Sequence, residues 1–156
     1  NEKFSENIKV IPYGLNGILY EKIYPYLDKL NIKIDNKINY DIFDNLKPRR
    51  YNVFVEKIII SLDNAIESSL KSADKLLMIN LYEDKSSIIV EVKNSYSSNI
   101  NIDHLGAKNY STKGYNRGLG LFSAFRNKEA ELSVKIINNT FICLIKAKKN
   151  KNIWLN

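Results

Sequence analysis

The chain has 156 residues, of which 44% are hydrophobic and 26% are charged, an ordinary composition for a globular domain. This length predicts a single domain with its own hydrophobic core. No apolar run approaches the roughly 20 residues of a membrane-spanning helix, and no signal segment opens the chain. The first residue is Asn1 and not methionine, so we expect the chain to be a fragment of a longer protein.

The formal net charge of +7 and the isoelectric point near 9.3 favour an anionic partner. Nucleotides, nucleic acids, acidic proteins and anionic lipid surfaces all meet that condition. Lysines spread along the chain carry most of the charge, and arginines occur only at positions 49, 50, 117 and 126. The charge alone therefore does not select among these partners.

The first part of the chain predicts a connector, a helix and a strand. Residues 1–12 are polar with little periodicity and are typical of a connector. Residues 14–30 repeat apolar side chains at helical spacing, and Pro25 inside that pattern predicts a kink or an early end. Residues 31–38 alternate apolar and polar side chains, which predicts a strand.

The middle of the chain predicts a long helix followed by two strands. An apolar face runs through residues 49–72, and Pro48 marks the point where this helix could begin. Residues 76–83 and 87–94 have the composition of strands joined by a short polar turn. Residues 95–113 are polar and irregular, and long for a connection in a compact domain, so we expect a functional lid there.

The last part predicts a helix over residues 117–127 and a hairpin of two strands, ELSVKII and TFICLIKA. Asn138 and Asn139 join these strands and tolerate the positive φ of a tight turn. Cys143, the only cysteine, excludes an internal disulfide, fits a reducing compartment and is expected to be buried on the second strand. Meandering strands with helices kept to one face predict a two-layer α/β sandwich.

The stretch STKGYNRGLGL has the features of a phosphate-binding turn. Its glycines let backbone N–H groups approach a ligand, and the predicted helix that follows favours an anion at its N-terminus. Lys113 and Arg117 add positive charge, while Ser111 and Thr112 add hydroxyl donors. Neither a P-loop nor a dinucleotide fingerprint is present. Taken alone, a glycine-rich turn of this kind is more often a structural hinge than a ligand site.

The second motif is SLDNAIESS on the long predicted helix. Asn64 is a poor helix former in mid-helix, so its presence requires an explanation. A solvated polar face is one. The other is an amide oxygen that coordinates a hard cation such as Mg²⁺, which itself carries phosphate oxygens.

The chain resembles the GHKL ATP-binding superfamily, which includes histidine kinases. The resemblance is carried, in chain order, by LDNAIE, a strand pair, a polar stretch and STKGYNRGLGL. The resemblance is closest to the catalytic domains of Agr-type quorum-sensing receptor histidine kinases, and it covers about residues 11–148. It implies the Bergerat ATP-binding fold, with a mixed sheet covered on one face by about three helices. It also implies ATP and Mg²⁺ as cofactors.

The resemblance assigns a role to individual residues. Asn64 matches the N-box asparagine that holds Mg²⁺, and Asn94 matches the position of an aspartate that binds the adenine amino group. Asn139 and Thr140 match a region that often contacts adenine. The residues that match the phosphate-wrapping second glycine box are Ser111, Thr112, Lys113, Gly114, Arg117, Gly118, Gly120 and Leu121.

Two departures from the family pattern bear on activity. The first glycine box is replaced by NSYSSN, which contains no glycine. Ile60, one turn before Asn64, stands where histidine kinases have a second asparagine and ATP-hydrolysing relatives have a glutamate, so no general base is expected there. Kinase activity and a degenerate nucleotide-binding pseudokinase that serves as a partner-interaction module therefore both remain open.

The implied function is transfer of the ATP γ-phosphoryl group to a histidine on an upstream helix, with relay to a response regulator in a two-component system. The expected arrangement is a connector at residues 1–12, the ATP-binding domain at 13–149 and a tail at 150–156, in the cytoplasmic part of a bacterial membrane-anchored receptor that dimerises upstream. His104 is expected to be solvated or structural and not the phosphoacceptor. A nucleic-acid-binding module is a rival with little support, because the aromatic residues follow core spacing.

Overall fold

The computed structural model describes residues 2–9, 11, 14–39, 41–97 and 126–151, and the fold is described for these residues. Five strands form one mixed sheet in the order β1-β2-β3-β5-β4. Strand β1 pairs in parallel with β2, and the other neighbours are antiparallel. The strands are β1 (Asn31–Asn36), β2 (Leu76–Glu83), β3 (Ser87–Ser95), β4 (Glu131–Ile137) and β5 (Thr140–Lys148).

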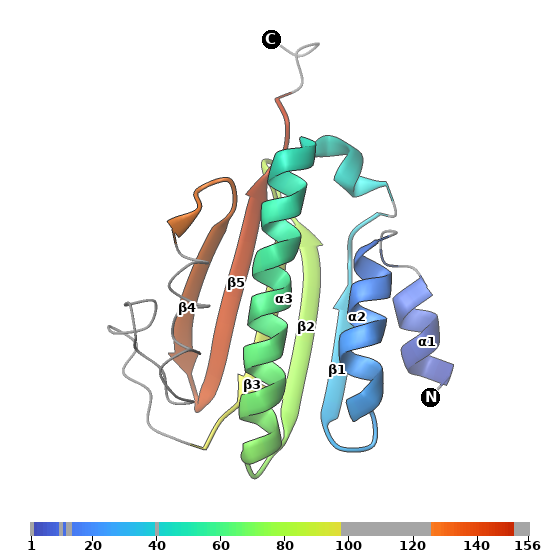
Figure 1. The fold of residues 1–156 in the computed structure, drawn as a ribbon, viewed down its shortest axis with the longest axis vertical. Coiled ribbons are helices and arrows are strands. Elements are labelled where there is room, and N and C mark those ends of the chain that lie inside the picture. The colour runs from blue at the N-terminus through green and yellow to red at the C-terminus, as the bar shows by residue number, and fades with distance from the viewer. Residues whose placement is uncertain (1, 10, 12–13, 40, 98–125, 152–156) are drawn as a thin grey trace.

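The helices lie on one face of this sheet, with α3 across its middle and α2 over the β1 side (Figure 1). This arrangement confirms the predicted two-layer α/β sandwich. Two short 3₁₀ turns, η1 (Tyr24–Tyr26) and η2 (Ile42–Asn45), lie in the connections. The helices are α1 (Glu2–Lys9), α2 (Leu15–Ile23) and α3 (Pro48–Lys71).

The prolines act as the sequence predicts. Helix α2 ends at Ile23, and Pro25 is part of the 3₁₀ turn η1 that follows. Pro48 occupies the first turn of α3, where its missing N–H costs no helical hydrogen bond. Of the kink or early end predicted at Pro25, the early end is what the structure shows, and the predicted start at Pro48 is confirmed.

Helix α1 lies within the segment that the sequence analysis treats as a polar connector. Phe4 and Ile8 are separated by one helical turn and are 7% and 5% exposed, so they join the hydrophobic core. Ile11 is fully buried as well. Among the described residues of this segment, Phe4, Ile8 and Ile11 reach the core, and their spacing of four and three residues is that of a helix. The prediction of little periodicity was therefore wrong here, because three apolar residues were outweighed by the polar residues around them.

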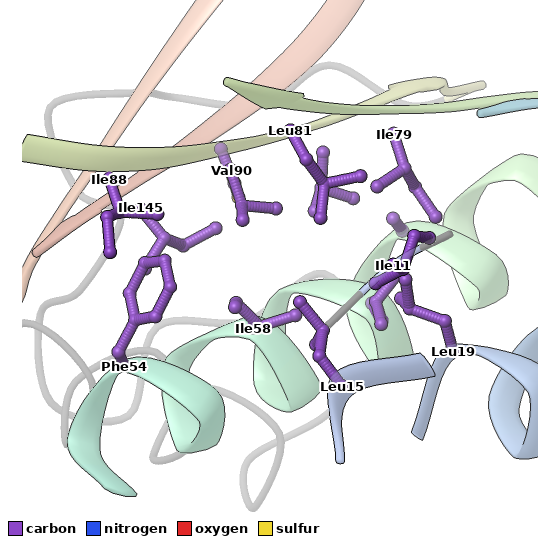
Figure 2. Close-up of a cluster of buried hydrophobic side chains, with 14 of the residues drawn as sticks. Ile11, Leu15, Leu19, Phe54, Ile58, Ile79, Leu81, Ile88, Val90 and Ile145 are labelled. Atoms are coloured by element: carbon purple, nitrogen blue, oxygen red, sulfur yellow. The ribbon is translucent and has the colours of Figure 1, made fainter. Parts of the chain in front are cut away.

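The core fills the space between the sheet and the helices (Figure 2). Helix α3 contributes Phe54 and Ile58, and α2 contributes Leu15 and Leu19, all fully buried. They meet a layer of strand residues, namely Ile79, Leu81, Ile88, Val90 and Ile145. Burial of each such side chain contributes roughly 1.5–3 kcal/mol, so this layer fixes α3 on the sheet.

The two hairpins use different turn chemistry. The Asp84 carboxylate accepts hydrogen bonds from the backbone N–H groups of Ser86, at 2.9 Å, and Ser87, at 2.7 Å. Asn138 and Asn139 have φ values of 49° and 60°, which confirms the positive φ predicted for the second hairpin. Cys143 on β5 is 2% exposed and is buried as predicted. No helix among the described residues has both the length and the apolar character needed to cross a membrane.

Candidate functional site

Asn64 lies on α3 with its side chain half-buried. Its amide nitrogen donates a hydrogen bond of 2.9 Å to the backbone carbonyl of Ile60, one turn earlier. This bond holds the amide group against the helix and assigns its nitrogen to an intrahelical role. The oxygen is then the atom of Asn64 with the chemistry to coordinate a cation.

Ile60 supplies only its backbone carbonyl to this arrangement. Its side chain is partly buried and packs against the hydrophobic core. A hydrocarbon side chain can neither activate water nor coordinate a metal.

The donor set around Asn64 fits a Mg²⁺ ion only when phosphate oxygens complete it. No group of three or more His, Cys, Asp or Glu side chains gathers anywhere in the described part of the chain. The neighbouring Asp63 faces α2, where its carboxylate forms an ion pair of 3.0 Å with Lys22. Mg²⁺ commonly uses one or two protein oxygens together with substrate phosphates and water, so a single amide oxygen is compatible with a nucleotide-bound ion.

Asn94 lies near the end of β3, on the strand face shared with Val90 and Val92. Its side chain is buried, and its amide nitrogen donates a hydrogen bond of 2.9 Å to the carbonyl of Ser95. As in Asn64, the nitrogen is used locally, and the oxygen has the acceptor chemistry expected toward an adenine amino group.

The sheet register brings Thr140 to the same edge. Ser95 pairs with Thr140, and Asn94 pairs with Phe141, across the β3–β5 ladder. Asn139 is in the turn that precedes β5. The predicted adenine-side residues Asn94, Asn139 and Thr140 therefore lie at one end of the sheet, where α3 also ends (Figure 1).

A buried serine pair, which sequence reasoning missed, joins these elements. The Ser72 and Ser95 hydroxyls are 2.5 Å apart. Ser95 Oγ accepts the N–H of Leu76 at 2.8 Å, and Ser72 Oγ accepts the N–H of Lys75 at 3.0 Å. These bonds link the C-terminal end of α3 to the start of β2 and the end of β3. The sequence shows only that a serine stands near each of these strand ends. Serines are common at such positions, so this pattern does not predict a buried hydrogen bond between two of them.

Lys57 is a second residue that sequence reasoning missed. It is on the buried side of α3 and is 2% exposed. Its ammonium donates hydrogen bonds to the backbone carbonyls of Asn127 and Ala130. Burial, and then the nearby Lys128, lower its pKa below that of an ordinary lysine, while Glu56 and Glu131 oppose this shift. The signal in the sequence was a lysine within the apolar run VEKIII, where a solvated residue is not expected.

The remaining predicted site residues lie outside the described part of the chain. They are His104 and the residues of the second glycine box, Ser111, Thr112, Lys113, Gly114, Arg117, Gly118, Gly120 and Leu121. Their roles stay predictions from the sequence. The helix predicted for residues 117–127 falls almost entirely within the same stretch.

Comparison with solved structures supports the fold. The catalytic domain of the histidine kinase ThkA, in a nucleotide-free form, superposes with a TM-score of 0.64 at 15% identity, covering 88% of this chain and 94% of that one. The histidine kinase AdeS of Acinetobacter baumannii gives a TM-score of 0.57 at 15% identity, covering 96% of this chain and 77% of that one. Full-length ShkA in complex with AMPPNP gives 0.57 at 11% identity, covering 90% of this chain and 31% of that one.

Comparison of the sequence itself gives the family. A search of curated proteins found no relative of the chain. The family model described as "GHKL domain" matches residues 53–148, which include most of α3 and all of the strands from β2 to β5. The chain therefore belongs to the GHKL domain family and has the fold of histidine-kinase catalytic domains.

Proposed function

We propose that the chain is the Mg·ATP-binding catalytic domain of a two-component sensor histidine kinase. The observation that carries this proposal is the placement of Asn64. The chain is a GHKL domain, and its Asn64 is on helix α3. The amide nitrogen of Asn64 is bound to the carbonyl of Ile60, and the amide oxygen is the group suited to a nucleotide-bound cation.

Catalysis by such a domain consists of positioning and charge neutralisation. Bound Mg²⁺ would neutralise charge on the phosphates, and Asn64 would supply one of its oxygen ligands. Asn94 would accept the adenine amino group, and Lys113 and Arg117 would neutralise the remaining phosphate charge. The γ-phosphoryl group would pass to a histidine on an upstream helix and then to a response regulator.

The sequences LDNAIE and STKGYNRGLGL support the narrower proposal of an Agr-type quorum-sensing receptor kinase. In that setting the chain would be the cytoplasmic part of a bacterial membrane-anchored receptor that forms a homodimer through its upstream region. Residues 1–12 would connect to that region, 13–149 would form the ATP-binding domain, and 150–156 would form a tail. Phe4 and Ile8 pack into the core, so the connector would be firmly attached to this domain.

Calorimetric titration with an ATP analogue, with and without Mg²⁺, tests the proposal. We expect Mg²⁺-dependent binding by the wild type and a loss of about tenfold or more, ~1.4 kcal/mol, in Asn64→Ala when Mg²⁺ is present. Asn52→Ala is the matched control, because Asn52 is an exposed asparagine on the same helix. Equal Mg²⁺-dependent binding by the wild type and Asn64→Ala would contradict the metal role. Failure of the wild type to bind any nucleotide would contradict the function.

Ile60 supports a second candidate, a nucleotide-binding pseudokinase that acts through protein partners. Its side chain packs against the core, so the position contributes no polar group to the metal or the phosphates. Labelled ATP added to a longer chain that includes the upstream histidine separates the two candidates. Phosphorylation of that histidine supports the kinase, and nucleotide binding without transfer supports the pseudokinase.

A further inference from the structure

Lys57 is an unusual residue for the centre of a buried helix face. Helix α3 has 24 residues, and most of the side chains that it buries are apolar or small. Lysine is almost never fully buried unless its charge is compensated. At 2% exposure, Lys57 therefore needs specific partners.

Those partners are two backbone carbonyls in residues 127–130, here called the 127–130 turn. The Lys57 ammonium donates one hydrogen bond to the carbonyl of Asn127 and one, of 2.5 Å, to that of Ala130. Removal of the ammonium would leave two carbonyls in this region without these donors. The link therefore joins the middle of α3 to a turn about 70 residues later in the chain.

A second, weaker link supports the same placement of the turn. Glu129 lies 3.6 Å from the side chains of both Arg49 and Arg50 at the start of α3. Within the turn, the Asn127 side chain accepts the backbone N–H of Glu129 at 3.0 Å. The turn thus has its own local hydrogen bond and contacts α3 at two places, the start of the helix and Lys57.

The hydrogen bonds from Lys57 to the 127–130 turn lie on the same helix as Asn64, the proposed cation ligand. The two residues are seven apart on one helix, which places them on the same face, two turns or about 10 Å apart. The face that carries Asn64 is therefore also the face to which the 127–130 turn is attached. The turn contacts α3 at Arg49, Arg50 and Lys57, so a shift of the turn would act on Asn64 through this face of the helix.

We infer that Lys57 is a positioning residue for the nucleotide site, because it holds the 127–130 turn against the face of α3 that carries Asn64. This inference rests on the proposed nucleotide binding. It does not require Lys57 to touch the nucleotide. The charged groups that act electrostatically on its ammonium are Lys128 in the turn, Glu131 just after it, and Glu56 on α3.

The test compares the wild type with Lys57→Met, Lys57→Arg and the control Lys71→Met, all in the full 156-residue chain. Lys71 is an exposed lysine at the end of the same helix. Calorimetry measures ADP affinity with Mg²⁺ well below the melting temperature of each variant, and mass spectrometry measures amide exchange over residues 126–131.

We expect Lys57→Met to exchange these amides about tenfold faster and to bind ADP about tenfold more weakly. Lys57→Arg, which keeps the charge and the donors, should recover most of the affinity, and Lys71→Met should match the wild type. If Lys57→Met exchanges faster but binds ADP within twofold of the wild type, the positioning role is overturned and the link is only structural.

Failure of the proposed function gives a different result. If the wild type binds no ADP, nucleotide binding and the positioning role both fail, but the exchange data still show whether Lys57 holds the turn. If Lys57→Met does not fold, Lys57→Gln replaces it. An arginine variant that binds ADP no better than the glutamine variant then overturns the inference.

Discussion

The hydroxyl groups of Ser72 and Ser95 lie 2.5 Å apart although the two residues are 23 positions apart in the chain. Ser72 is the C-cap residue that follows α3, and Ser95 is the last residue of β3. Both side chains are buried, so water cannot replace the bond without local opening. The pair fixes the end of the helix beside the strand end that carries Asn94.

Removal of either hydroxyl should destabilise the protein. Ser95→Ala leaves the N–H of Leu76 and the hydroxyl of Ser72 without this partner, and we expect a loss of about 1–3 kcal/mol in the free energy of unfolding. The double variant Ser72→Ala/Ser95→Ala should lose less than the sum of the single variants, because the two residues share one bond. Urea denaturation followed by circular dichroism measures all three.

Ser133→Ala is the control for these variants, because Ser133 is an exposed serine on β4. Its unfolding free energy should stay within about 0.5 kcal/mol of the wild type. Strict additivity of the two buried substitutions would show that the serines are not energetically coupled.

Gly14→Ala should also destabilise the protein. Gly14 has a φ of 92°, and a Cβ at this position would lie 2.8 Å from the Tyr51 hydroxyl. The backbone strain alone costs about 1–3 kcal/mol, and Tyr51 packs against the core, which restricts how far it can move away. The melting temperature measures the effect.

Gly17→Ala is the matched control in the same region. Gly17 lies inside α2, and a Cβ added there would meet nothing within 4 Å beyond the backbone of its own helix. Alanine there should leave stability unchanged or raise it by up to about 1 kcal/mol, because glycine is the poorer helix former. A Gly14→Ala protein as stable as Gly17→Ala would contradict the contact with Tyr51.

Asp84 should make stability depend on pH in the acidic range. Hydrogen bonds from the backbone N–H groups of Ser86 and Ser87 hold the pKa of Asp84 below its usual value. The unfolded chain then binds the proton more tightly than the folded one, so the stabilisation is present above the ordinary aspartate pKa of about 3.9. It is lost as the pH falls through the lower folded-state pKa.

We therefore expect the melting temperature of Asp84→Ala to lie below that of the wild type near neutral pH. This difference should shrink as the pH falls below about 3.9. Asp74→Ala, which removes an exposed aspartate from another turn, controls for the loss of one negative charge. A difference that stays constant down to acidic pH would show that the carboxylate hydrogen bonds do not stabilise the turn.

Local patterns in the sequence predicted most of the secondary structure. Strands β2 and β4 have the predicted bounds, and α3 begins at Pro48 within one residue of its predicted start. These elements have strong periodicity, and proline or asparagine marks several of their ends, so short-range sterics are sufficient to predict them. Helix α1 was not predicted, because its few apolar residues, although at helical spacing, stand in a short segment that is otherwise polar.

The candidate site was predictable only in part. Asn64 was found because asparagine is a poor residue for mid-helix, and Asn94 was assigned from resemblance. The serine pair and Lys57 were not found, because their partners lie 23 and about 70 residues away. No local pattern in the sequence indicates a contact over such separations.

The sequence by itself determined the identity and order of most elements, the turn at Asn138 and Asn139, and the residue types available to a nucleotide. The tertiary structure decided which of those residues share a surface. Strand register placed Thr140 opposite Ser95, and helix packing placed Lys57 against the 127–130 turn. Register and packing are collective properties of the whole core, since each depends on apolar side chains from many separate segments.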